Sequence, residues 1–132
     1  MSLDVQIEVK GSYVHLHCRG TFSVAAGLEV YAKAFEVAAR GGRDRVLIDA
    51  TGIEGVPPTT MERYEMGARA AQFFMKQAQR IRIAVVGKEP FVDPNRFAET
   101  VAANRGANGR VFTDVLEAVA WLEKEPGKET GG

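Results

Sequence analysis

The chain has 132 residues, of which 45% are hydrophobic and 26% are charged, and these proportions are ordinary for a globular protein. Basic and acidic residues both number 17, so the net charge is zero, which argues against a general affinity for nucleic acid or anionic membranes. One cysteine, no signal-peptide pattern and no apolar run near the roughly 20 residues of a membrane span together indicate a cytoplasmic protein.

The first predicted element is a β-hairpin, because apolar and polar residues alternate on both sides of Gly11-Ser12. A turn at these two residues pairs Val9 with Val14 and Glu8 with His15. The apolar face carries Val5, Ile7, Val9, Val14, Leu16 and Cys18. The other face, which carries His15 and His17, is expected to be exposed to solvent.

Helical spacing of apolar residues follows from Ser23 to about Ala39, with Ser23 as the expected N-cap and Gly41-Gly42 as the stop. A short apolar run at 45–49 then predicts a strand buried on both faces, which ends at Asp49. The loop after it carries two glycines and two prolines. A strand, a loop and a helix start in this order favour a binding site at their junction.

The next helix is expected over residues 59–79, because Thr59-Thr60-Met61-Glu62 fits the capping-box pattern. Its predicted buried stripe is Met61, Tyr64, Ala68, Ala71, Met75 and Ala78. Three further apolar residues, Met66, Phe73 and Phe74, lie partly outside that stripe. They are most simply core residues, but they are also candidates for a homodimer contact or for the lining of an apolar ligand cavity.

A second buried strand is expected over 81–87, a helix from Asp93 to about Gly106, a short strand over 110–113 and a last helix from Asp114 through Leu122. The fold class is therefore α/β, with a mixed five-stranded sheet and about four helices. The N-terminal hairpin is antiparallel and the later strands are parallel. We expect one domain over residues 1–124 and a disordered tail over 125–132.

Motifs for catalysis or cofactor binding are missing from the chain. Neither a dinucleotide fingerprint nor a P-loop is present, and no nucleophile elbow occurs. Glu8, His15 and His17 offer metal-ligand atoms, but the pattern alone is more typical of a solvated strand face with a cross-strand pair. We therefore predict no catalytic residue, no cofactor and no metal site, and favour a non-enzymatic protein.

The candidate functional residues are Asp49, Thr59 and Thr60, as a switch or as contacts for a partner. Asp49 ends a buried strand, where it could act in a site or bond the backbone of its own loop, and the second role is favoured. A threonine at the helix start is fully explained as an N-cap. A phosphate on the same hydroxyl would also be stabilised by the helix dipole.

The order of these elements resembles the STAS family, the domains of anti-sigma factor antagonists, over about residues 4–122. The resemblance rests on the hairpin, on Gly20-Thr21-Phe22-Ser23, on the segment RVLIDATG at 45–52 and on TDVLEAVAWL at 113–122. The last segment is most similar to the divergent SpoIIAA-like branch, which is also compared with CRAL-TRIO lipid-binding proteins. The resemblance implies a regulatory domain that binds a protein partner.

STAS regulators carry a phosphorylated serine in a D-S-[ST]-G segment at the start of the second helix. Here the corresponding residues are Val56-Pro57-Pro58-Thr59-Thr60-Met61, without serine, aspartate or glycine. We expect a non-enzymatic interaction module without the usual phosphoacceptor, whose functional edge gathers Thr21–Ser23, Gly52–Thr60 and Gly87–Asp93. The alternative is a carrier or sensor of a small apolar, lipid-like ligand between the 59–79 helix and the sheet.

Overall fold

The computed structural model describes residues 3–76, 81–92 and 108–124. Five strands form one sheet in the order β1-β2-β3-β4-β5, with β1 antiparallel to β2 and every other neighbouring pair parallel. The strands are β1 (Asp4–Lys10), β2 (Tyr13–Thr21), β3 (Arg45–Glu54), β4 (Arg82–Val86) and β5 (Gly109–Phe112). The helices are α1 (Val24–Gly41), α2 (Thr60–Lys76) and α4 (Val115–Glu123).

The predicted mixed five-stranded sheet is confirmed, but the predicted number of helices is not. The described residues contain three helices rather than four. The helix expected from Asp93 to about Gly106 falls outside the described residues, as does the tail expected over 125–132. Among the described helices, none is both long and apolar enough to cross a membrane.

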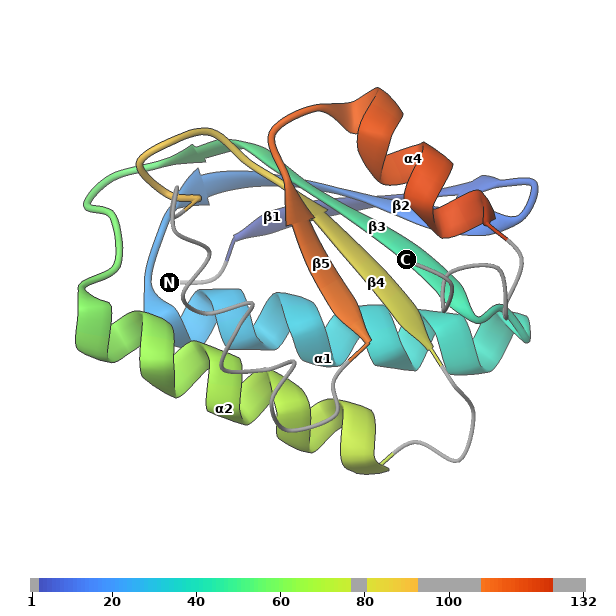
Figure 1. The fold of residues 1–132 in the computed structure, drawn as a ribbon, viewed down its shortest axis with the longest axis horizontal. Coiled ribbons are helices and arrows are strands. Elements are labelled where there is room, and N and C mark those ends of the chain that lie inside the picture. Colours follow the sequence, from blue (N-terminus) through green and yellow to red (C-terminus); the bar gives the residue numbers. More distant parts are fainter. Residues whose placement is uncertain (1–2, 77–80, 93–107, 125–132) are drawn as a thin grey trace.

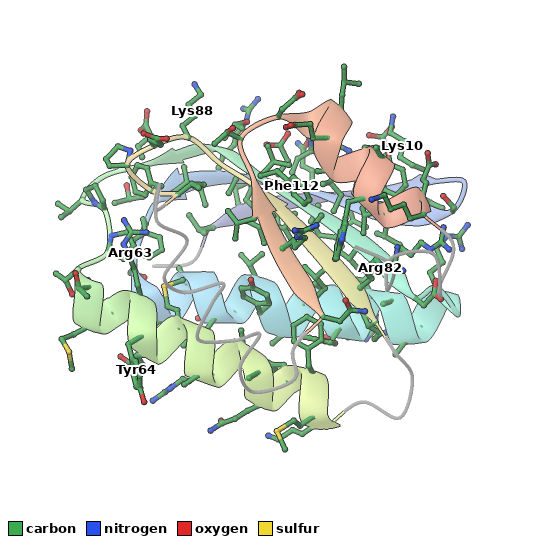
Figure 2. All side chains as sticks on the ribbon, in the orientation of Figure 1. Lys10, Arg63, Tyr64, Arg82, Lys88 and Phe112 are labelled. Atoms are coloured by element: carbon green, nitrogen blue, oxygen red, sulfur yellow. The ribbon has the colours of Figure 1, made fainter. Side chains whose placement is uncertain are left out.

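The helices lie on both faces of the sheet, α1 and α2 on one and α4 on the other (Figure 1). The larger core lies between the sheet and α1, where Leu16, Phe35 and Ile48 are buried. A smaller core lies under α4 around Leu47 and Trp121. Phe112 of β5 packs against it (Figure 2). Burial on both faces explains the continuous apolar run of β3.

The hairpin has the predicted register, with Val9 opposite Val14 and Glu8 opposite His15. Its expected solvent-exposed face is wrong at one position, since His15 is only 8% exposed. The reason is its place on β2, the second strand of the sheet, where it packs between Tyr13 and His17. The edge strand β1 instead exposes Ile7 and Val9.

Local capping signals were reliable predictors of where helices begin and end. Ser23 accepts a hydrogen bond from the backbone N–H of Ala26 at 3.1 Å and caps α1. Gly42 ends the same helix in the left-handed conformation, at φ 64°, which glycine adopts without strain. Asp114 caps α4 by accepting from the N–H of Leu116 at 3.2 Å.

The predicted buried stripe of α2 is wrong at three of its positions, it is confirmed at Ala71, and its last member, Ala78, lies outside the described residues. Met61, Tyr64 and Met75 are exposed, and the buried residues are Gly67, Ala70 and Ala71. Small residues face α1 because the two helices pack side by side, and bulky ones at those positions would hold them apart. The outer face of α2 thus carries large apolar side chains that the pattern assigned to the core.

Strand β3 runs five residues beyond the predicted end at Asp49, to Glu54. Its second half pairs with Arg19, Gly20 and Thr21 of β2 after an irregularity in register. Between His17 and Arg19 of β2 lies one residue, whereas the paired positions Asp49 and Gly52 of β3 enclose two. This extra residue is a β-bulge in β3.

Candidate functional site

The connections that follow β2, β3 and β4 meet at one end of the sheet, where the C-terminal ends of these parallel strands lie (Figure 1). The backbone N–H of Phe22 donates to the carbonyl oxygen of Glu54 at 2.8 Å, which joins the first two connections. The Phe22 ring also meets the edge of the Phe91 ring, with centroids 6.0 Å apart. We call this region, Thr21–Ser23 with Gly52–Thr60 and residues 87–92, the contact edge.

Arg63 of α2 ties the third connection to the other two. Its Nη1 donates to the carbonyl oxygen of Phe91 at 3.0 Å, and its Nη2 donates to that of Pro90 at 2.6 Å. Arginine suits this task because its planar guanidinium offers several donors in fixed directions. Arg63 was not among the candidate residues predicted from the sequence, where its position one turn into a capped helix was the available signal.

Thr59 and Thr60 lie at the contact edge, at the start of α2. The N–H of Glu62 donates to Thr59 Oγ1 at 3.1 Å, and the N–H of Thr59 donates to Glu62 Oε1 at 2.8 Å. This reciprocal pair is a capping box and fixes the backbone of both threonines. Both side chains are exposed, and so are their apolar neighbours Val56 (80%) and Met61 (76%).

Beneath the contact edge lies an apolar cavity of about 150 Å³ between the sheet, α1 and α2. Its walls include Phe22, Tyr31, Ala50, Ile53, Met66 and Phe91. Arg63 is the one charged residue among its described lining. Apolar walls with few polar groups are typical of small-molecule sites, and a dry cavity of this volume accommodates a molecule about the size of benzene.

The three candidates for a ligand or dimer surface, Met66, Phe73 and Phe74, face into the protein. Phe73 stacks on Phe35 of α1 at 5.8 Å between centroids, and Phe74 meets the same ring edge-on at 5.0 Å. Met66 lines the cavity. These contacts fit the core and ligand interpretations, and they give the homodimer interpretation no support.

Asp49 lies on the opposite face of the sheet, away from Thr59 and Thr60, so the three candidate switch residues do not form one site. Its Oδ1 accepts from the N–H of Thr51 at 3.0 Å and from its hydroxyl at 2.7 Å. The favoured role of Asp49, bonding nearby backbone, agrees with this geometry. Partial burial opposes ionisation, but the bonds from Thr51 outweigh it and hold the pKa of Asp49 below its usual value.

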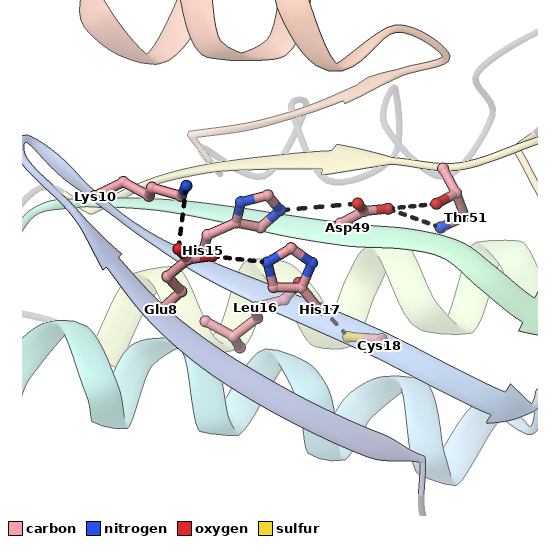
Figure 3. Close-up of polar contacts among 8 residues, drawn as sticks. All are labelled: Glu8, Lys10, His15, Leu16, His17, Cys18, Asp49 and Thr51. Atoms are coloured by element: carbon pink, nitrogen blue, oxygen red, sulfur yellow. Dashed lines mark hydrogen bonds and ion pairs between the residues drawn. The ribbon is translucent and has the colours of Figure 1, made fainter.

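A polar cluster continues from Asp49 across β2 to β1 (Figure 3). His15 Nε2 lies 3.8 Å from Asp49 Oδ2, and the His15 ring stacks on His17 with centroids 3.8 Å apart. Burial lowers the pKa of His15, and His17 lowers it further, so the contact with Asp49 involves a neutral ring. Glu8 accepts from His17 Nε2 at 3.3 Å.

Lys10 closes the polar cluster at its β1 end. Its Nζ lies 3.1 Å from Glu8 Oε2, and hydrogen bonds from Lys10 and His17 lower the pKa of Glu8. Beside the cluster is an open hollow of about 280 Å³, bordered by Gln6, His17 and Asp49 among others. The cluster is thus reachable from solvent, since the side chains of His17 and Glu8 are also partly exposed.

Cys18, next to His17 on β2, points the other way and lines the apolar cavity. It is buried, and burial raises the pKa of its thiol to about 11, with the charge of Asp49 acting in the same direction. A protonated, buried thiol is a poor nucleophile.

Comparison with known proteins identifies the fold. The sequence matches no family model and no curated protein. Among solved structures, an anti-sigma factor antagonist from Mycobacterium paratuberculosis superposes with a TM-score of 0.61 at 12% identity, covering 93% of this chain and 96% of that one. An uncharacterised protein from Shewanella loihica with a SpoIIAA-like fold gives 0.51 at 20% identity, covering 92% and 94%.

The chain therefore has the STAS-like, SpoIIAA-like fold that the order of its elements resembles. The likeness extends over nearly the whole length of both neighbours. At these identities the likeness concerns the fold alone. Neither neighbour bears on the expected relation to CRAL-TRIO proteins.

Proposed function

We propose that this protein is a non-enzymatic interaction module that binds a protein partner through the contact edge. The observation that carries the proposal is the exposure of Val56 and Met61, at 80% and 76%, on either side of Thr59 and Thr60. Large apolar side chains exposed together on a rigid backbone are typical of a binding surface. The neighbour from Mycobacterium paratuberculosis, an anti-sigma factor antagonist, gives the fold a precedent in regulation.

The contact edge is rigid before any partner binds. The capping box holds the start of α2, and Arg63 holds the connection after β4. A rigid surface loses little conformational entropy on binding, so its apolar area is available to stabilise the complex. Thr59 uses its hydroxyl as the helix cap, which leaves it a contact residue rather than a phosphoacceptor in this proposal.

Capture of partners from a cell lysate tests this surface when matched variants are used. Val56→Asp with Met61→Asp places one charge on the contact edge and a second directly beside it, next to Thr60. Leu116→Asp and Met75→Asp are matched controls, because both side chains are equally exposed, at 78% and 75%, but lie elsewhere. We expect a defined protein with the wild type and both controls, and its loss with the double variant.

Equal recovery with all variants, or no partner with any of them, would contradict the proposal. Thr59→Glu and Thr60→Glu extend the test to a switch. If Thr60→Glu alone changes recovery while α2 stays folded, a negative charge at this position controls binding. Loss of the helical signal with Thr59→Glu would instead show that this substitution removes the N-cap of α2.

The apolar cavity favours a second candidate function, binding of a small apolar ligand. Native mass spectrometry of freshly purified protein should show a bound mass if the cavity is occupied in cells. Ala50 lines the cavity, so Ala50→Leu should fill it, whereas Ala32→Leu adds the same group to the exposed face of α1. We expect benzene, used as a probe, to raise the Tm of the wild type and of Ala32→Leu but not of Ala50→Leu.

A further inference from the structure

We propose that Glu8, His15 and His17 bind one divalent transition-metal ion, of the type represented by Zn²⁺, on the open face of β1 and β2. The metal-ligand atoms of these three side chains all lie within 4.8 Å of one another. This cluster lies on the opposite face of the sheet from the apolar cavity. The proposal is therefore independent of the proposed contact edge.

The strand register assembles the three side chains. His15 and His17 are two residues apart on β2, so both point to the same face of the sheet. Glu8 of β1 is the direct cross-strand partner of His15 and bonds His17 at 3.3 Å. An ion held by all three would therefore cross-link the edge strand to its neighbour.

The strongest evidence for a metal ion at this cluster is the burial of His15. Its side chain is 90% buried or more, and neither Nδ1 nor Nε2 has a hydrogen-bond partner among the described residues. A buried polar group without a partner loses its hydrogen bonds to water and gains none in return, so such groups call for an explanation. A solvated strand face does not explain them, because His15 is not solvated.

A metal ion would satisfy this ring, and Asp49 is placed to orient it. Nε2 of His15 faces Asp49 Oδ2 at 3.8 Å, which leaves Nδ1 for the side where Glu8 and Lys10 lie (Figure 3). A carboxylate behind a ligating histidine is the usual outer partner at zinc sites, where it fixes the tautomer. Asp49 is thus a positioning residue.

The donor set determines the type of metal. Two imidazoles and one carboxylate suit Zn²⁺ and related ions rather than Mg²⁺ or Ca²⁺, which prefer oxygen ligands alone. Three protein ligands leave a fourth position for water. The open hollow beside His17 gives that position access to solvent.

Binding requires side-chain movement that the cluster permits. Tetrahedral ligands about 2.05 Å from an ion lie about 3.3 Å from each other. His17 Nε2 and Glu8 Oε1 already lie at this distance, whereas the cluster of three ligand atoms as a whole extends over up to 4.8 Å. The side chains of His17 and Glu8 are 40% and 51% exposed, so both can turn, whereas His15 is held by packing. The stack between His15 and His17 must open for both rings to reach one ion.

Lys10 should lower the affinity of the cluster for a metal ion, and this effect can be tested by substitution. Its ammonium group lies 3.1 Å from Glu8 Oε2 and competes for the carboxylate that the ion needs. Removing this charge by Lys10→Met should therefore strengthen metal binding. A site that formed by chance elsewhere on the surface would not respond to Lys10.

The experiment is titration of untagged, chelator-treated full-length protein with Zn²⁺ by calorimetry, and with Co²⁺ as an absorbing probe. We expect one ion per chain, with affinity reduced at least about tenfold by His17→Ala and by Glu8→Gln. Glu29→Gln, an exposed carboxylate on α1, is the matched control and should leave affinity unchanged. Lys10→Met should raise it.

His15 requires a separate readout, because replacing a buried residue can unfold the protein. Proton NMR signals of both histidine rings should shift on addition of Zn²⁺ to the wild type. Absence of saturable one-to-one binding would overturn the proposal. So would a His15 ring that does not respond, or an affinity that Glu29→Gln lowers as much as His17→Ala does.

Discussion

Arg63 Nη1 donates a hydrogen bond to the carbonyl oxygen of Phe91 at 3.0 Å, and this bond joins α2 to the connection after β4. Both residues also line the apolar cavity. One side chain thus holds the contact edge and borders the cavity. Any ligand that displaced the guanidinium would loosen the contact edge.

Replacing Arg63 by alanine should lower the free energy of unfolding by about 1 kcal/mol, because two bonds to carbonyl oxygens are lost at a partly exposed position. Arg69→Ala is the control on the same helix. Its bond to Glu65 is an exposed ion pair, so its loss should change stability by less than about 0.5 kcal/mol. Urea unfolding measures both, and equal effects would contradict the role given to Arg63.

The two adjacent threonines at the start of α2 should differ in their contribution to stability. Thr59→Ala removes the cap and should cost about 1 kcal/mol, since the N–H of Glu62 loses its partner. Thr60→Ala leaves the capping box intact and should change stability little, because alanine is a good helix former. Thermal unfolding compares them, and a larger loss with Thr60→Ala would show that the helix begins elsewhere.

Arg82 is buried at the start of β4 and bonds the end of α4, with Nη1 2.8 Å from the carbonyl oxygen of Trp121 and 2.9 Å from that of Lys124. Its guanidinium also lies 5.2 Å from the centre of the Trp121 ring. Arg82→Met should cost about 3 kcal/mol, because the last carbonyls of α4 lose a charged donor in a buried position. A change in Trp121 fluorescence should accompany that loss.

Arg82→Lys is the informative companion to that variant. Lysine keeps the charge but not the planar arrangement of donors, so stability should fall between that of Arg82→Met and the wild type. A lysine variant as stable as the wild type would mean that charge alone holds α4. If Arg82→Met were as stable as the wild type, the bonds of Arg82 to the end of α4 would not contribute to stability.

Cys18 should react slowly with thiol reagents in the folded protein. The residue is only 2% exposed, so a reagent can reach the thiol only after local opening of the sheet. We expect a rate at least about 100-fold below that of the same chain in denaturant. Fast reaction under native conditions would show that the cavity admits the reagent, and Leu16, equally buried beside it, should remain protected in hydrogen exchange.

Features encoded by neighbouring residues could be predicted from the sequence. The hairpin register follows from a turn at Gly11-Ser12 and the alternation around it, and each cap is set within a few residues. Features that depend on contacts between separate elements, such as the buried face of α2, could not be predicted from local patterns. Met61 and Met75 lie at helical spacing as the buried residues do, and only the approach of α1 selects which face is covered.

The candidate site was predictable only in part, for a related reason. The sequence indicated that connections at the ends of parallel strands would meet, and Phe22, Arg63 and Phe91 show how they do so. The cavity and the burial of His15 depend on side chains from separate elements, which no local pattern reveals. The placement of Asp49 away from Thr59 follows from strand alternation, which the expected end of β3 at Asp49 concealed.

The extra residue in β3 determines which side chains face which side of the sheet. Ile48 and Ala50 line the cavity, and without the bulge the next residue on that face would be Gly52. With it, Ile53 takes the place, while Asp49, Thr51 and Gly52 border the polar hollow. A strand of the same sequence without the bulge would therefore turn Ile53 toward the face that carries the histidines and leave Gly52 in the cavity wall.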